Sequence, residues 1–262
     1  MPKIHPSAIV DPAARLGDSV EVGPSCIVGP DAVIGEGTKL GPGVIVKGWT
    51  TIGRDNVIMP YAVIGSPPQD FSWKGDRSYL RIGDANIIHE YVTISPGSKP
   101  ESETVVGSNC MIMVGCHVAH NCRVGNNVVL VNNVALGGYV EVGDRVFISA
   151  LSAVHQFCRI GRMAMVATLT RPSQDVPPFT LVQDCPALVY TLNVVGMTRA
   201  GLSAETRAQI KRAYKLLYHD KFNFSEAVSV IEGTPELISV PEVKELADFV
   251  KSAKRGICAH HR

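Results

Sequence analysis

The sequence has no excess of charge of either sign. Its 262 residues include 25 Lys and Arg against 24 Asp and Glu, so the formal net charge at pH 7 is +1. Proteins that bind nucleic acid or an anionic membrane surface usually carry a basic excess. We therefore expect no nucleic-acid partner, and any anionic ligand must be held by a few local side chains.

Long apolar runs are absent too. No stretch approaches the roughly 18 apolar residues of a membrane-spanning helix, and the beginning, MPKIHPSAIV, lacks the layout of a signal peptide. The seven cysteines are odd in number and include no C-x-x-C pair, which favours reduced thiols over a disulfide framework. We expect a soluble, cytoplasmic protein with no membrane span.

Aromatic side chains are scarce, at 6% of the chain, whereas Ile, Leu and Val together make up 68 of the 262 residues. These aliphatic residues recur every six positions in three uninterrupted series, and many of them are followed by Gly. A period of six fits neither an α-helix nor a coiled coil and is typical of a β-helix. The series are Ile4, Val10, Leu16, Val22, Val28, Ile34, Leu40, Val46, Ile52, Ile58 and Ile64, then Ile82, Ile88 and Ile94, then Val106, Ile112, Val118, Val124, Leu130, Leu136, Val142, Ile148, Val154, Ile160 and Val166.

The repeats predict a chain that coils around a triangular prism. Each hexapeptide supplies one side, the aliphatic residue points into a stacked core, and the following Gly adopts the backbone conformation of a corner. The pattern resembles the hexapeptide-repeat family, whose coils are left-handed with eighteen residues per turn. The fold class we predict is thus mainly β, a left-handed parallel β-helix in residues 1–185, assembled as a homotrimer.

Two interruptions of the period, 66–81 and 95–105, should project from the coil as loops, and in solenoids such insertions often fall on the binding face. Beyond about residue 170 the period stops. Helical signals follow: Ser203 caps a helix to about His219, Asn223 or Ser225 starts a second, and Pro241 opens a third to about Lys254. We predict a C-terminal helical domain in 186–262.

His120 is the leading candidate for chemistry. It lies two positions after the inward Val118, so its side chain should point outward. The positions eighteen and thirty-six residues later are Gly138 and Gln156, which places an imidazole, a bare backbone and an amide in one column. A neutral imidazole can take a proton from a hydroxyl, and a glycine N–H can stabilise an oxyanion. This combination favours acyl transfer, although a surface histidine beside a turn glycine fits the same pattern.

Metal binding is the rival interpretation. His117 and His120 are three apart along an extended chain, so their side chains should diverge, which disfavours zinc chelation by one strand. Cys110, Cys116 and Cys122 recur every six residues and should lie on three different sides of the prism. We predict no metal site.

The sequence also resembles the acyl-carrier-protein:UDP-N-acetylglucosamine O-acyltransferases that begin lipid A biosynthesis. The resemblance covers nearly the whole chain and is carried by IGSPPQDFSWKGD, HVAHNCRVGNNVVLVNNVALGG, AVHQFCRIG, SQDVPPF and GLSAETRAQIKRAYKLLY. It implies transfer of a 3-hydroxyacyl chain from acyl-carrier-protein, the donor thioester, to a UDP-sugar without another cofactor.

The resemblance also implies roles for individual residues. His120 would be the general base and the Gly138 N–H the oxyanion donor. Asp70, beside Gln69, would position the sugar, reaching across to a neighbouring subunit. The rest of the implied substrate site is His117 and Gln156 near the sugar and nucleotide, Asn193 and Arg199 on the nucleotide, Met165 along the acyl chain, and Thr168 at its end, where added bulk predicts a chain shorter than fourteen carbons.

Several positions depart from the pattern of that family. Asn121 stands where an aspartate usually follows the catalytic histidine, and the altered positions around the sugar and nucleotide are Ser72, Ser95, Tyr139, Pro186, Val195 and Ala200. These changes leave three alternatives open: N-acyl transfer to a 3-amino sugar, acetyl transfer to another nucleotide sugar, and a non-catalytic trimeric paralogue. A thiol nucleophile at Cys122 is a further, less favoured mechanism.

Overall fold

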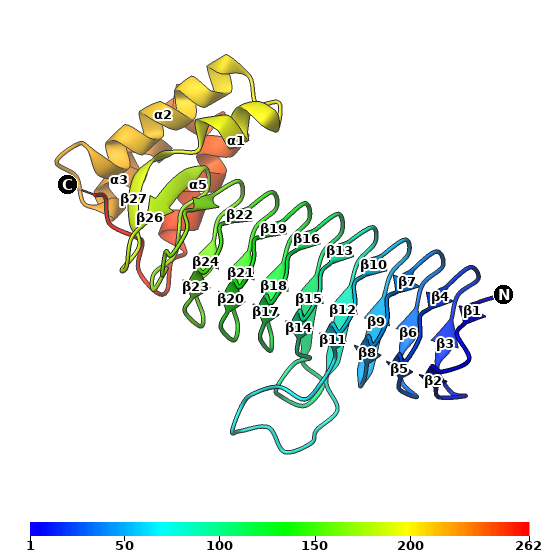
Figure 1. Ribbon diagram of the computed structural model, residues 1–262. Coiled ribbons are helices and arrows are strands. Elements are labelled where there is room, and N and C mark those ends of the chain that lie inside the picture. Colours follow the sequence, from blue (N-terminus) through cyan, green and yellow to red (C-terminus); the bar gives the residue numbers. More distant parts are fainter. Residues whose placement is uncertain (262) are drawn as a thin grey trace.

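The structure, a computed structural model, describes residues 1–261. The chain coils from its N-terminus as a left-handed, three-sided parallel β-helix, and helices cover the other end of the prism (Figure 1). No helix within the described part of the chain has the length and apolarity needed to cross a membrane. The predicted fold class is confirmed.

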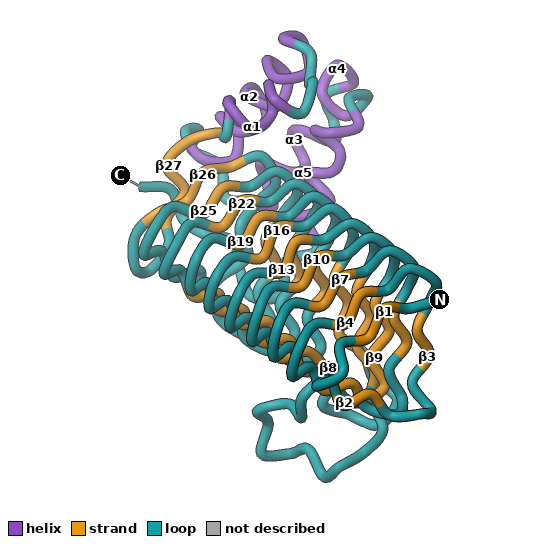
Figure 2. Tube along the Cα trace, turned by 45° about the vertical axis from the view of Figure 1, so that its right-hand side comes forward, coloured by secondary structure: helices purple, strands orange, loops and turns teal. Residues whose placement is uncertain are grey.

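Each side of the prism is one sheet of short strands (Figure 2). Sheet A consists of β1 (Lys3–Ile4), β4 (Glu21–Val22), β7 (Lys39–Leu40), β10 (Val57–Ile58), β13 (Ile87–Ile88), β16 (Met111–Ile112), β19 (Val129–Leu130), β22 (Phe147–Ile148), β25 (Met165–Val166), β26 (Thr180–Gln183) and β27 (Leu188–Leu192). Sheet B consists of β2 (Ile9–Val10), β5 (Ile27–Val28), β8 (Ile45–Val46), β11 (Val63–Ile64), β14 (Thr93–Ile94), β17 (His117–Val118), β20 (Ala135–Leu136) and β23 (Ala153–Val154). Sheet C consists of β3 (Arg15–Leu16), β6 (Val33–Ile34), β9 (Trp49–Ile52), β12 (Tyr79–Ile82), β15 (Glu103–Val106), β18 (Arg123–Val124), β21 (Glu141–Val142) and β24 (Arg159–Ile160).

The register follows the hexapeptide period. Ile4 pairs with Val22, and Leu136 pairs with Val154, so a regular coil uses eighteen residues. The aliphatic residues of the repeat fill the interior, and from the second coil onward they are buried. Burial of each such side chain stabilises the prism by about 1.5–3 kcal/mol, which is how two-residue strands can hold a long coil together.

The glycine that follows many inward residues has a different role from the one predicted. Except at Gly65, with φ of 81°, it does not have the left-handed backbone conformation, which falls two residues later, at Asn121 and Asn127 for example. At Gly35 a Cβ would lie 2.4 Å from the carbonyl oxygen of Gly53 in the next coil. The glycine is required because neighbouring coils approach each other closely there.

The two insertions leave the coil at one corner, between sheets B and C. The first joins β11 to β12 and the second joins β14 to β15, as the projecting loops in Figure 1 show. Both loops are shorter than the predicted 66–81 and 95–105 because β12 begins at Tyr79 and β15 at Glu103. An ion pair between Arg77 Nε and Glu101 Oε1, 2.8 Å apart, joins one loop to the other.

The predicted boundary at residue 185 falls between two strands of sheet A, β26 (Thr180–Gln183) and β27 (Leu188–Leu192). β26 and β27 extend sheet A as far as Leu192. The helices are α1 (Val194–Arg199), α2 (Ala204–Tyr218), α3 (Phe224–Glu232), α4 (Pro235–Ile238) and α5 (Pro241–Lys251). Ser203 and Asn223 cap α2 and α3 and Pro241 begins α5, as predicted, whereas α5 ends at Lys251 and the short α1 and α4 were not predicted.

Candidate active site

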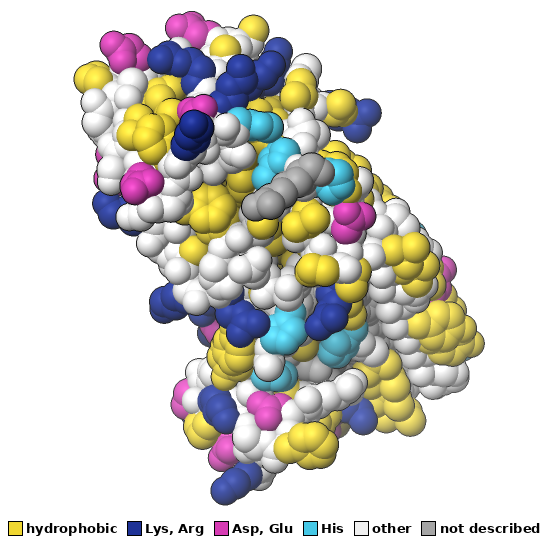
Figure 3. Space-filling model, turned by 90° about the vertical axis from the view of Figure 1, so that its left-hand side faces the viewer, with side chains coloured by type: hydrophobic (Ala, Val, Ile, Leu, Met, Phe, Trp, Pro, Cys, Tyr) yellow, Lys and Arg dark blue, Asp and Glu magenta, His cyan; other side chains and the backbone are white. Residues whose placement is uncertain are grey.

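His120 lies at the corner where the chain turns from β17 in sheet B to β18 in sheet C. Pro12 and Pro30 occupy the equivalent corner position in the first two coils, so the coil itself does not require a histidine. The side chain points outward, as predicted, and is only 14% exposed because the projecting loops cover it. Figure 3 shows two groups of histidine side chains on one face of the molecule, each with Lys or Arg side chains nearby.

Gly138 lies directly beneath the imidazole, one coil further along. A Cβ on Gly138 would lie 2.5 Å from His120 Cε1 and 2.7 Å from Nε2. Any other residue would displace the ring. The predicted stacking of positions 120 and 138 is confirmed.

The Gly138 N–H is not used by the coil, and Gly138 itself is buried. The neighbouring amides are used by the coil, since the Gly137 N–H donates to Val154 O and the Tyr139 N–H to His120 O. Among residues 1–261 no acceptor takes the Gly138 N–H. The prolines at this corner in the first coils show that the coil does without this donor.

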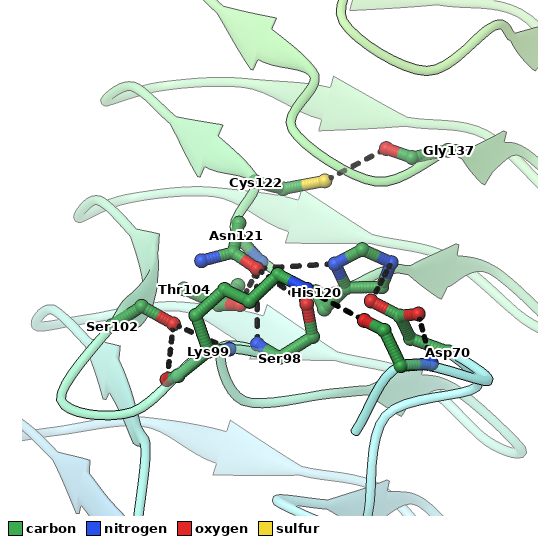
Figure 4. A network of polar contacts seen from close by, with 10 residues as sticks. Asp70, Ser98, Lys99, Ser102, Thr104, His120, Asn121, Cys122 and Gly137 are labelled. Carbon is green, nitrogen blue, oxygen red and sulfur yellow. Dashed lines mark hydrogen bonds and ion pairs between the residues drawn. The ribbon is translucent and has the colours of Figure 1, made fainter. Parts of the chain in front are cut away.

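Asn121 fixes the tautomer of the imidazole (Figure 4). Its Oδ1 accepts the Ser98 N–H at 3.0 Å, and because a backbone N–H can only donate, this atom must be the oxygen of the amide. The same Oδ1 is 3.1 Å from His120 Nδ1. Nδ1 therefore carries the proton, and Nε2 of the neutral ring has the free lone pair.

Asp70, from the first loop, lies on the other side of the ring, with Oδ2 3.8 Å from His120 Nε2. Its Oδ1 accepts the Ser72 N–H at 2.8 Å. Hydrogen bonds from Ser72 and from the Ser98 hydroxyl hold the pKa of this carboxyl far below its usual range, so Asp70 is charged. Asp70 lies beside the His120 of its own chain, and its reach toward a neighbouring subunit stays a prediction.

Three other predicted residues lie near this corner. His117 is in β17, and its Nδ1 is 2.7 Å from the Thr93 hydroxyl. Burial and the nearby His120 lower the pKa of His117, so it is neutral at pH 7. The expected divergence of the two histidine side chains stays a prediction. Gln156 lies one coil beyond Gly138, and Gln69, beside Asp70, is exposed.

The remaining predicted residues lie elsewhere on the same chain. Met165 is in β25 of sheet A, and Thr168 is exposed at the corner that follows. Asn193 is buried and caps α1, since its Oδ1 accepts the Gly196 N–H and its Nδ2 donates to Met163 O. The side chain of Asn193 thus has a structural role in this chain. Arg199 ends α1 and lines a cavity together with Met165 and Asn193.

The rival chemistries find no support at this site. Within residues 1–261 no group of three His, Cys, Asp or Glu side chains is arranged to hold a metal ion. Cys122 is fully buried and donates to Gly137 O, and burial raises the pKa of its thiol to about 12. A protonated, inaccessible thiol cannot attack a thioester.

Phe157 was not predicted as part of the site, and Tyr139 was named only as a position that departs from the family pattern. The Tyr139 ring meets the His120 ring edge-on with centroids 5.5 Å apart, and Phe157 stacks on Tyr139 at 4.9 Å. The two residues are eighteen apart, so the period that linked 120 to 138 also predicts this stack. Phe157 stays 48% exposed, which leaves an aromatic surface next to the base.

An imidazole with a free Nε2, above a glycine with a free N–H, can deprotonate a hydroxyl and stabilise the oxyanion formed at a carbonyl. On a left-handed β-helix these features define an acyltransferase of the hexapeptide-repeat class. Sequence and structure comparisons agree. The family profile for bacterial transferase hexapeptides (six repeats) matches residues 31–66 and 103–138, and that for domain 2 of UDP N-acetylglucosamine O-acyltransferase matches residues 175–258.

Relatives similar over nearly their whole length specify the family. The chain is 46% identical to the acyl-carrier-protein–UDP-N-acetylglucosamine O-acyltransferase of Myxococcus xanthus, covering 98% of this chain and 99% of the relative. It is 44% identical to the enzyme of the same name from Anaeromyxobacter sp. strain Fw109-5, covering 97% and 98%. The solved structure of the Francisella novicida UDP-N-acetylglucosamine acyltransferase matches with a TM-score of 0.94 at 36% identity, covering 98% and 94%. The chain belongs to the UDP-N-acetylglucosamine O-acyltransferase family.

Proposed function

We propose that this chain transfers a 3-hydroxyacyl group from acyl-carrier-protein to the 3-hydroxyl of UDP-N-acetylglucosamine, the first step of lipid A biosynthesis. The observation that carries the proposal is the position of His120 between Asn121 and Asp70, with Gly138 beneath it. The carrier thioester is the acyl donor, and no further cofactor takes part. The cytoplasmic location predicted from the sequence is part of the same proposal.

In the proposed reaction, His120 Nε2 takes the proton of the sugar hydroxyl as its oxygen attacks the thioester carbonyl carbon. The Gly138 N–H donates to the oxyanion of the tetrahedral intermediate. When the intermediate collapses, the C–S bond breaks, the new C–O bond remains, and the imidazolium returns its proton to the leaving thiolate. No acyl-enzyme forms, which agrees with the buried, protonated thiol of Cys122.

Asp70 and Asn121 would assist by position and charge. The Asp70 carboxylate near Nε2 stabilises the imidazolium that forms transiently and accepts hydrogen bonds from the sugar hydroxyls. Asn121 holds the Nδ1 proton, so the ring keeps Nε2 free for each turnover. A neutral amide fixes the tautomer without adding a second negative charge beside Asp70.

The active unit we propose is a homotrimer. Within one chain, His120 lies at the corner between sheets B and C, whereas Arg199 and Met165 lie over sheet A and the end of the prism. One UDP-sugar with its acyl chain would reach both groups if two prisms packed side by side. A cyclic trimer provides three such clefts, and sedimentation at three times 28.1 kDa is the expected result.

His120→Ala tests the function, with His5→Ala, at the far end of the prism, as the matched control. Wild-type protein is given acyl-carrier-protein thioesters and a mixture of UDP-N-acetylglucosamine and a UDP-3-amino sugar, and mass spectrometry should detect an ester product. His120→Ala should lower turnover by about 10² or more and still bind the UDP-sugar. If the product is an amide from a 3-amino sugar, or if wild-type turnover is nil, the proposed acceptor or the enzymatic role is wrong.

A further inference from the structure

Two arginines without acidic partners share one cavity of about 430 Å³. Arg145 comes from the corner between β21 and β22, and Arg199 ends α1. Phe147, Met165 and Val195 line the same cavity, and its lining includes no Asp or Glu. The space is therefore basic with an apolar wall.

The charge of Arg145 is not used within residues 1–261. The arginines that form ion pairs in that part of the chain are Arg77, Arg81, Arg123, Arg159 and Arg162. The adjacent acid, Asp144, accepts the Asn126 N–H and lines a different cavity together with Arg162. It does not neutralise the cavity that Arg145 lines.

The backbone at this corner does not call for arginine. Position 145 has the left-handed conformation with φ of 57°, and its N–H donates to Asn126 O. Asn109 and Asn127 occupy the same corner in earlier coils with the same φ of 57°. Met163 occupies the corner in the next coil with φ of 55°, so this position accepts several residue types and does not itself account for a cation.

We infer that Arg145 is a second phosphate-binding residue of the acceptor site, and that with Arg199 it holds the diphosphate of the nucleotide sugar. A guanidinium offers paired donors that match phosphate oxygens, and two of them match a diphosphate. Phe147 provides apolar surface for the nucleoside. The inference rests on the proposed function, because it assigns one end of the same substrate.

Arg145→Asn is the sharpest test, because it removes the charge and keeps the residue type that the corner favours. Arg145→Lys keeps a cation without the planar fork, and Arg54→Asn, an exposed arginine in an N-terminal coil, is the matched control. Calorimetric titration with UDP, UMP and uridine separates phosphate binding from nucleoside binding. Thermal unfolding of each variant checks the fold.

Arg145→Asn should weaken UDP binding about tenfold, the effect of losing a charge-assisted hydrogen bond, with uridine unchanged and Arg145→Lys in between. KM for the UDP-sugar should rise by a similar factor while kcat stays within twofold. Equal losses for UDP and uridine, or a UDP affinity within twofold of the wild type, would overturn the inference. Absence of UDP-sugar acylation by the wild type would instead overturn the proposed function, and the inference with it.

Discussion

Gly138→Ala isolates the contact between the glycine and the imidazole. The new Cβ would be built 2.5 Å from His120 Cε1, so the ring must retreat by about 1 Å to reach an ordinary carbon–carbon contact of about 3.5 Å. The backbone at 138 is not left-handed, and alanine is therefore tolerated by the coil. The fold should survive while the base moves.

A displacement of about 1 Å in a reacting group costs about 10² in rate, which corresponds to about 2.7 kcal/mol in the activation free energy. We expect kcat/KM to fall by that factor, with a change in Tm of about 3 °C or less, equivalent to about 1 kcal/mol. Gly29→Ala is the matched control, because a Cβ there would make an ordinary contact at 3.6 Å with Val46 O. The reasoning is refuted if Gly138→Ala retains kcat/KM within threefold, or if the control loses as much activity.

The other predictions concern single side chains. Asn121→Gly removes the acceptor for Nδ1 without backbone strain, so kcat should fall about 10–100-fold, whereas Asn121→Asp should retain activity. If steady-state assays gave Asn121→Gly the same kcat as the wild type, the tautomer argument would be contradicted. Iodoacetamide at pH 7.5 should modify the exposed Cys185 and spare Cys122 in the native protein. If peptide mass spectrometry found Cys122 labelled and the labelled protein had lost activity, the structural role given to Cys122 would be wrong. The pKa of His117 is lowered on folding, so the unfolded chain binds more protons below about pH 6.5. The free energy of unfolding should therefore fall as the pH drops from 7 to 5. Urea titrations of His117→Gln should show a smaller fall, and the same dependence of the unfolding free energy on pH as in the wild type would exclude this residue as a cause. We propose that Thr168 limits the acyl path, so C10 or C12 should be preferred over C14, with a penalty of about fourfold per methylene. A competition assay won by C14, or no change in Thr168→Gly, would reject the chain-length role.

The period of six was sufficient to predict most of the architecture. Because a coil of eighteen residues stacks equivalent positions, the period predicts that His120 lies over Gly138, and the same spacing links Tyr139 to Phe157. The predicted corner conformation of the glycines was wrong at Gly35, because the constraint there comes from the next coil and not from the backbone angles of the glycine itself. Local rules describe one residue, whereas this clash involves two coils.

The parts that escaped prediction depend on contacts distant in sequence. Asn121 looked like a missing carboxylate, but the Ser98 N–H, 23 residues away on a projecting loop, orients its amide toward His120. Asp70 is held against its own chain by the same loop region. Insertions lack a period, so nothing in the sequence fixed where these two loops would settle.

The amide that the coil leaves unpaired at the edge between sheets B and C has a consequence for how chemistry can arise on this scaffold. Proline replaces this donor at the same edge, at Pro12 and Pro30, with no loss to the solenoid, whereas at the edge after sheet C the equivalent amides of Arg54 and Asn126 donate to Asp84 and Asp144. An oxyanion donor at Gly138 therefore does not lower the free energy of unfolding of the coil. Elsewhere along the edges, a single substitution to glycine under a suitable neighbour would be enough to expose another.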